Sequence, residues 1–140
     1  MIDSFKLVNH RFEPIRESLT STYHYEWRPG LMHYRMQREG RINKRDEGTY
    51  PLPERAMPIL LDFLLSNDLL TNRNILHNPY NHPSGYQGAD GLDIKINCQL
   101  AGKSIQQHYR GTSVQLEAYA EALHELWRLV DGFLPQAGQQ

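Results

Sequence analysis

Apolar and polar residues alternate most regularly over Leu92–Leu100, where every second side chain is leucine, isoleucine or cysteine. A period of two is typical of a strand with one buried face. Ala101 and Gly102 follow as a turn, and residues 103–110 supply a second strand. We therefore predict a hairpin here, because so short a connection can join only antiparallel neighbours.

This hairpin is followed by apolar residues at helical spacing over residues 114–129. They recur on one side of the predicted helix, which is the pattern of a helix packed on a sheet. Thr112 and Gln115 fit a capping box at its start, and Ser113 is an alternative cap.

A similar arrangement occurs earlier in the chain. Residues 31–38 alternate, Gly40 turns the chain into a short polar strand over residues 41–45, and residues 46–48 make another turn. The apolar segment 54–65 predicts the helix of this first unit.

Residues 20–26, which precede the loop 27–30, also alternate, and this predicts a hairpin with the strand over residues 31–38. A slip of one residue would move every side chain to the other face, so the loop length matters. A four-residue loop pairs Tyr25 with Met32 and gathers the tyrosines and methionines on one face, whereas a three-residue loop splits them. We expect the four-residue loop, which places His24 directly opposite His33.

These patterns predict an α+β fold whose antiparallel sheet is built from two strand–turn–strand–helix units, with the two main helices packed on one face. Residues 1–135 form one domain, and residues 136–140 form a flexible tail. Residues 2–19 are expected to form a short element that packs on the sheet. The expected core consists of Tyr34, Met36, Leu60, Phe63, Leu64, Ile94, Ile96, Cys98, Leu116, Leu123, Leu126 and Trp127.

The formal net charge is −1 and 22% of the residues are charged, which argues against nucleic-acid binding driven by bulk charge. Cys98 is the single cysteine, so neither an internal disulfide nor a cysteine-based zinc site is expected. The N-terminus lacks a signal-peptide pattern, and no apolar run approaches membrane-spanning length. We expect a cytoplasmic protein with no membrane partner.

The irregular stretch 72–90 is a candidate binding loop. Tyr80 and Tyr86 provide large contact areas that suit a protein interface, and His77 and His82 lie beside them. Two histidines could also hold a metal ion or position a water molecule for hydrolysis. The spacings that make metal or catalytic motifs specific are missing, so a structural connection is the third reading.

The first hairpin offers two further candidates. His24 and His33, opposed across two strands, would be close enough to share a metal ion, although two solvated histidines are the simpler reading. Basic residues gather on the same hairpin around Arg35 and Arg38. They could attract an acidic protein partner electrostatically, or they could be an ordinary solvated face.

The layout in which Gly40 and Gly91 open strand pairs that each feed an amphipathic helix resembles small bacterial α+β proteins, some of which are immunity proteins that neutralise a toxin. The resemblance covers roughly residues 20–134. It implies a compact scaffold whose loops or sheet face meet a protein partner, and it transfers no functional residue.

The sequence therefore predicts a non-catalytic protein-binding module, such as an immunity protein or inhibitor, that needs no cofactor. Its expected contact residues are Tyr80, Tyr86, His77, His82, Arg35 and Arg38. The alternative is a small metal-binding protein or metal-dependent hydrolase that uses histidines of the first hairpin or of the central loop. The oligomeric state does not follow from the sequence.

Overall fold

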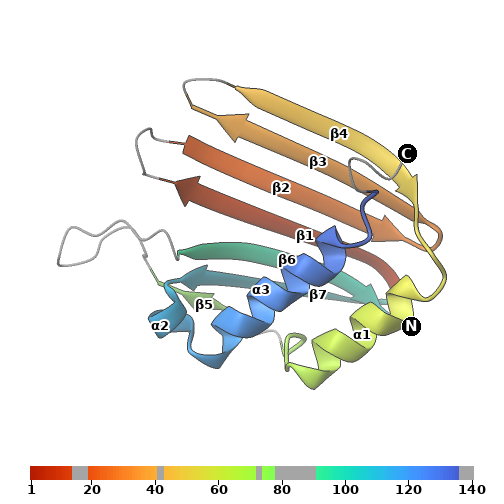
Figure 1. Cartoon of the computed structure of the whole chain (residues 1–140). Helices are drawn as coiled ribbons and strands as arrows, with labels where there is room; N and C mark the ends of the chain where they lie inside the picture. Colours follow the sequence, from red (N-terminus) through yellow and green to blue (C-terminus); the bar gives the residue numbers. More distant parts are fainter. Residues whose placement is uncertain (14–18, 41–42, 72–73, 78–90, 136–140) are drawn as a thin grey trace.

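The computed structural model describes residues 1–13, 19–40, 43–71, 74–77 and 91–135. Within these residues, the chain forms one seven-stranded sheet with helices on one of its faces (Figure 1). The strand order is β4-β3-β2-β1-β6-β7-β5, and the paired strands are antiparallel except for β5 and β7. The α+β class with a largely antiparallel sheet is confirmed.

The strands are β1 Ile2–Glu13, β2 Leu19–Arg28, β3 Leu31–Glu39, β4 Lys44–Pro51, β5 Ile75–Leu76, β6 Leu92–Leu100 and β7 Lys103–Gly111. The helices are α1 Ala56–Ser66, α2 Ser113–Leu116 and α3 Ala118–Asp131. No helix in the described part of the chain is long and apolar enough to cross a membrane.

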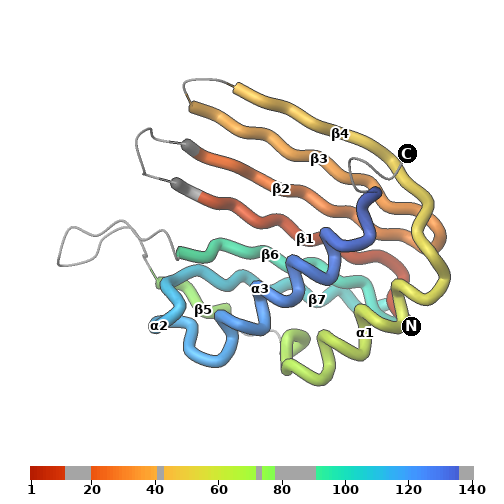
Figure 2. The backbone as a smooth tube through the Cα atoms, in the orientation of Figure 1, coloured from red at the N-terminus to blue at the C-terminus, as the bar shows by residue number. Residues whose placement is uncertain are grey.

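The N-terminal segment is the central strand of the sheet rather than a short element packed on it. β1 pairs with β2 on one side and with β6 on the other, so it joins the two hairpins that the sequence pattern revealed (Figure 2). Phe5 and Leu7 are fully buried on its helix side. The expectation for residues 2–19 is wrong because Val8, an apolar residue on the opposite face, obscures the alternation.

The β2–β3 hairpin has a two-residue turn at Pro29 and Gly30, not the four-residue loop expected. Gly30 has φ +81°, and proline followed by a residue of positive φ is the signature of a tight turn. Trp27 extends β2 and is fully buried. Tyr25 consequently pairs with Tyr34, a shift of two residues that preserves the predicted faces.

β4 also begins later than predicted. A strand over residues 41–45 and a turn at 46–48 were expected, whereas the residues of that turn lie inside β4 and pair with β3. Glu47 Oε2 accepts a hydrogen bond from Arg45 at 3.2 Å, and its Oε1 is 3.3 Å from His33 Nε2, so both contacts link its carboxylate to strand neighbours. Pairing with β3 overrides the local turn preference, as tertiary context commonly does in strands.

The hairpin of β6 and β7 agrees with the sequence, and Ala101 and Gly102 both have positive φ in its two-residue turn. The capping box is also confirmed: the Gln115 backbone N–H donates to Thr112 Oγ1 at 3.2 Å, and the Thr112 N–H donates to Gln115 Oε1 at 2.8 Å. The single helix predicted over residues 114–129 is instead interrupted at Glu117, where φ is +53°.

The core lies between the sheet and the helices. Of the twelve residues expected there, only Phe63 and Trp127 are half-buried rather than buried. Trp127 lies at the border, where its Nε1–H donates to the Tyr25 hydroxyl at 2.8 Å. Asn9 is fully buried, and its side-chain amide has no hydrogen-bond partner among the described residues, which costs about 1–3 kcal/mol of stability.

Candidate functional site

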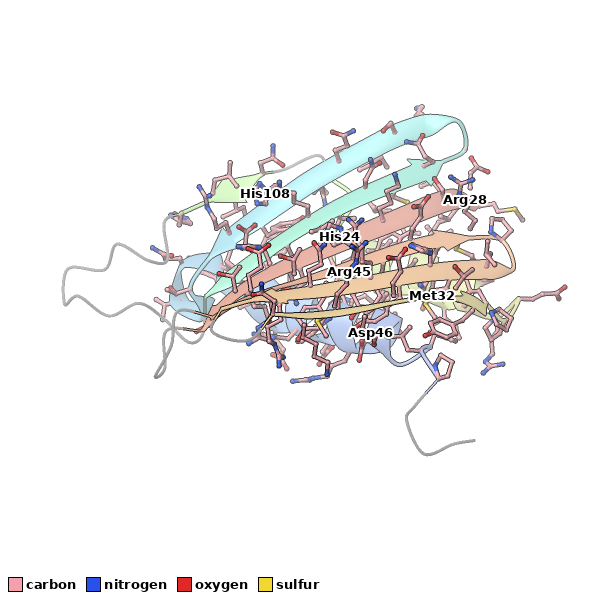
Figure 3. The ribbon with its side chains drawn as sticks, turned by 90° about the horizontal axis from the view of Figure 1, so that it is seen from above. His24, Arg28, Met32, Arg45, Asp46 and His108 are labelled. Carbon is pink, nitrogen blue, oxygen red and sulfur yellow. The ribbon has the colours of Figure 1, made fainter. Side chains whose placement is uncertain are left out.

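The face of the sheet opposite the helices is the candidate site, and we call it the open face. It carries the alternate, polar side chains of every long strand (Figure 3). His24 lies near its middle, between His108 on β7 and Arg45 on β4. The strand registers place these further residues on the same face: Lys6, Val8, His10, Thr22, Glu26, His33, Arg35, Gln37, Glu47, Asp93, Lys95, Asn97 and Gln106.

One row of cross-strand neighbours runs through the centre of this face. Val8 pairs with His24 on one side and with Lys95 on the other, and His24 pairs in turn with Arg35. Lys6 is two residues before Val8 on the same face of β1. Arg35 and Lys95 are three strand spacings apart, roughly 14 Å. The centre of the open face therefore holds an apolar side chain surrounded by bases.

Three carboxylates of the open face, those of Glu26, Glu47 and Asp93, already have partners. Glu26 contacts Arg28 at 3.1 Å, and Asp93 contacts His108 at 2.6 Å. Glu47 contacts two basic groups, as described for β4. Glu26 is the cross-strand neighbour of Lys6, and Glu47 is that of Arg35. Among the described residues, however, no carboxylate is within ion-pair distance of these bases or of Lys95.

Lys6, Arg35 and Lys95 consequently have no ion-pair partner among the described residues. Arg35 Nε is buried and has no hydrogen-bond acceptor in the described part of the chain, and Asn97 Oδ1 on the same face has no donor there. A buried donor that lacks an acceptor is unfavourable in the free protein. A bound acceptor group would relieve that cost.

Two adjoining hollows mark the open face. One of about 300 Å³ lies around His24, His33 and Arg35, and one of about 350 Å³ lies around Lys95 and His108. Both are also lined by Lys6 and Val8, so they meet at the centre of the sheet.

The pKa of His24 reflects its surroundings at the centre of the open face. Burial lowers the pKa of its imidazole below the usual 6.5, and the positive charge of Arg35 lowers it further. Burial and the neighbouring guanidinium thus both favour the neutral imidazole.

The structure corrects the expected pairing of the two hairpin histidines. His24 lies opposite Arg35, and His33 lies opposite Glu26, because of the two-residue turn. His33 Nδ1 is 3.0 Å from Thr49 Oγ1. Among the described residues, no group of three or more histidine, cysteine, aspartate or glutamate side chains could hold a metal ion.

The other predicted contact residues lie apart from one another. Arg38 is on the helix side of β3, where its Nε donates to Ser21 Oγ at 3.2 Å, so one flat partner surface cannot cover both Arg35 and Arg38. His77 is exposed beside β7, where its backbone N–H donates to the Arg110 carbonyl at 2.8 Å. Tyr80, His82 and Tyr86 lie outside the described residues.

Cys98 is on the helix side of β6 and is buried, as its alternation predicted. Burial raises the pKa of its thiol to about 11. A thiol with so high a pKa is protonated near neutral pH, and it is a poor nucleophile.

The sequence interpretation missed Lys6, Val8 and Lys95 as members of one site. Lys95 was recognisable as a polar residue of an alternating strand, but its neighbours were not. Only the pairing of β1 with β6 brings it beside Val8. An alternation of exposed and buried positions around Phe5 and Leu7 is the signal that could have identified β1.

A comparison with protein-family models and a comparison with curated proteins each found no match to this chain. The functional argument therefore rests on the open face itself.

Proposed function

We propose that this protein is a non-catalytic protein-binding module whose open face binds an acidic segment of a partner protein. The observation that carries the proposal is the set of three central bases, Lys6, Arg35 and Lys95, none of which forms an ion pair with a described residue. Each would gain a charge-assisted hydrogen bond from an acidic side chain of the partner.

The arrangement also suggests what the partner segment looks like. Val8 offers an apolar contact between the two hollows, and the bases lie around it. A segment that carries an apolar side chain flanked by aspartate or glutamate would match both features. Complementary charge of this kind raises the association rate and the specificity more than it raises the affinity.

A protein partner suits this face better than a nucleic acid does. Glu26, Glu47 and Asp93 are interspersed among the bases and would repel a continuous chain of phosphates. The tyrosines of β2, β3, β4 and β7 and the indole of Trp27 lie on the helix side, so these rings are not available to stack on nucleotide bases.

The resemblance to immunity proteins makes a toxin or an enzyme the kind of partner that we propose, and inhibition by stoichiometric binding the mechanism. A bacterial origin and a cytoplasmic location are parts of this proposal. So is the internal repeat, in which β3, β4 and α1 form one strand–turn–strand–helix unit, and β6, β7 and α3 form the other.

The alternative is a metal-binding protein or metal-dependent hydrolase. The contact that favours this alternative is His33 beside Glu47, where His33 Nε2 and Glu47 Oε1 are 3.3 Å apart. Metal analysis of the purified protein separates the two functions. A stoichiometric metal that is lost in His33→Ala, or in the double variant His77→Ala and His82→Ala, would favour the alternative.

The direct test is affinity capture from the native cell with a triple variant, Lys6→Glu, Arg35→Glu and Lys95→Glu. We expect the wild type to retain a specific acidic protein, and the triple variant to bind it at least tenfold more weakly. Association should also slow steeply as salt is raised, because the Debye length shortens to about 8 Å at physiological ionic strength.

A matched control changes the net charge equally away from the open face. Lys44→Glu, Arg55→Glu and Lys103→Glu replace three exposed bases that belong to the edge strand, to the start of α1 and to the helix side of β7. The control variant should retain the partner. The proposal fails if both triple variants bind equally well, or if the retained molecule is a nucleic acid.

A further inference from the structure

An open cleft lies on the helix side of the sheet, away from the open face. It has a volume of about 520 Å³ and lies between the C-terminal end of α3 and two strands, β3 and the edge strand β4. Two tyrosines, two aspartates and one arginine line it: Tyr34, Tyr50, Asp46, Asp131 and Arg128.

Gly48 shapes the sheet side of this cleft. It lies opposite Tyr34 in the β3–β4 pairing, between Asp46 and Tyr50 on the same face of β4. A Cβ atom at this position would overlap the hydroxyl and ring of Tyr50, so the ring lies over the glycine. The missing side chain thus lets the two aromatic residues and the carboxylate line one hollow.

The cleft combines three sources of negative potential. Asp46 and Asp131 supply carboxylates, and Asp131 Oδ1 is held by the Tyr25 hydroxyl at 2.6 Å. The 14-residue helix α3 ends at Asp131, and the C-terminal end of a helix dipole is negative. The faces of the tyrosine rings are negative as well.

The hydroxyl of Tyr34 responds to this potential. Burial raises its pKa to about 12, and the charges of Asp131 and Asp46 contribute to the rise. The same charges that disfavour an anionic tyrosine favour a cation in the cleft.

Arg128 is the opposing feature. It lies one turn before Asp131 on α3 and lines the cleft, yet none of the described carboxylates is within ion-pair distance of it. As part of the cleft lining, its positive charge opposes a bound cation.

We propose that this cleft binds an organic cation, an alkylammonium or guanidinium group, between the rings of Tyr34 and Tyr50 and the carboxylates of Asp46 and Asp131. Aromatic rings beside carboxylates form the usual cage for alkylated ammonium groups. Hard metal cations instead need six or more oxygen ligands, more than two aspartates provide. The site is independent of the open face and of the function proposed for it.

The test uses the full chain and a pair of probes of nearly equal shape, choline and its neutral isostere 3,3-dimethylbutan-1-ol. Titration followed by NMR should show saturable shifts of the Tyr34 and Tyr50 ring protons with choline, and binding of the isostere at least tenfold weaker. The proposal is overturned if choline and the neutral isostere bind equally well. It is also overturned if neither choline nor the lysine probe described below gives saturable shifts.

Variants of the cleft separate charge from shape. Asp46→Asn and Tyr50→Ala should each weaken choline binding at least threefold, whereas Tyr50→Phe, which keeps the ring, should bind as the wild type does. Arg128→Gln should tighten binding at least twofold, an outcome that a misfolded protein cannot imitate. The assignment is contradicted if the two single variants, Asp46→Asn and Arg128→Gln, both bind choline with the affinity of the wild type.

The source of the cation is decided by a second probe, Nα-acetyl-lysine methylamide. Tighter binding of this probe than of choline identifies the basic side chain of a polypeptide as the ligand, and tighter binding of choline identifies a free small cation. Lys103→Ala, at an exposed position of β7 far from the cleft, is the control variant and should leave both affinities unchanged.

Discussion

The pKa of His24 is a property of the open face that can be measured at a single residue. Its partial burial and its neighbour Arg35 both favour the neutral imidazole. The groups around it on the face are Arg35, Glu26, His33, Lys6 and Lys95, of which Lys6, Arg35 and Lys95 form no ion pair with a described residue. Its titration is therefore coupled to folding.

We predict that His24 makes the protein less stable in mild acid. Because its pKa in the folded protein is below the usual 6.5, the unfolded chain takes up the proton first. The contribution is fully present above pH 6.5 and is lost as the pH falls through the folded pKa. The free energy of unfolding, measured with urea, should therefore fall less for His24→Gln than for the wild type between about pH 7 and pH 5. Identical pH profiles would refute this.

At the scale of single elements, the start of α2 is specified by a local hydrogen-bond pair. Thr112 and Gln115 bond to each other's backbone, and Thr112 is buried. Glu117 then adopts positive φ and divides this turn from α3. The cap thus anchors a short helix that cannot draw stability from its own length.

We predict that Thr112→Ala lowers the free energy of unfolding by about 1 kcal/mol, since it removes the acceptor for the Gln115 N–H. Chemical denaturation of the two proteins at neutral pH measures the difference. Ser113→Ala tests the alternative cap, and a larger loss there than at Thr112 would show that the capping assignment is wrong.

At the scale of the whole molecule, one core supports both faces of the sheet. α3 covers the sheet through residues such as Leu123, which is fully buried, and Tyr25 connects this helix to β2 through its bond to Asp131. The open face lies on the other side of the same strands. Substitutions of exposed open-face residues therefore leave these core contacts in place, whereas Asp131 belongs both to the cleft and to the link between α3 and β2.

We predict that Leu123→Ala costs about 2–5 kcal/mol, because it leaves a cavity at a fully buried position. Leu65→Ala is the matched control, since this leucine of α1 is 60% exposed and should cost well below that range. Urea unfolding of both variants provides the comparison. Similar losses in the two variants would mean that α3 packs in a different orientation.

The sequence determined the features that depend on neighbours in the chain. The hairpin of β6 and β7, its turn at Ala101 and Gly102 and the capping box at Thr112 were all predicted correctly, because turn geometry, strand alternation and a cap involve residues only a few positions apart. The burial of Cys98 followed from the same alternation.

The tertiary structure decided what depends on pairing between distant segments. β1 became the centre of the sheet because β2 and β6 flank it, although Leu7 and Val8 together obscure its period. Glu47 lies in a strand because β3 provides its partners, against its local turn preference.

Both proposed sites belong to this second class. Val8 pairs with Lys95, and Asp46 lines the same cleft as Asp131. In each case the two residues are more than 80 positions apart in the sequence. The alternation of a strand tells which side chains share a face, but not which strand will lie beside it. Strand order is set by the burial of the whole core, and that is a property of the folded chain alone.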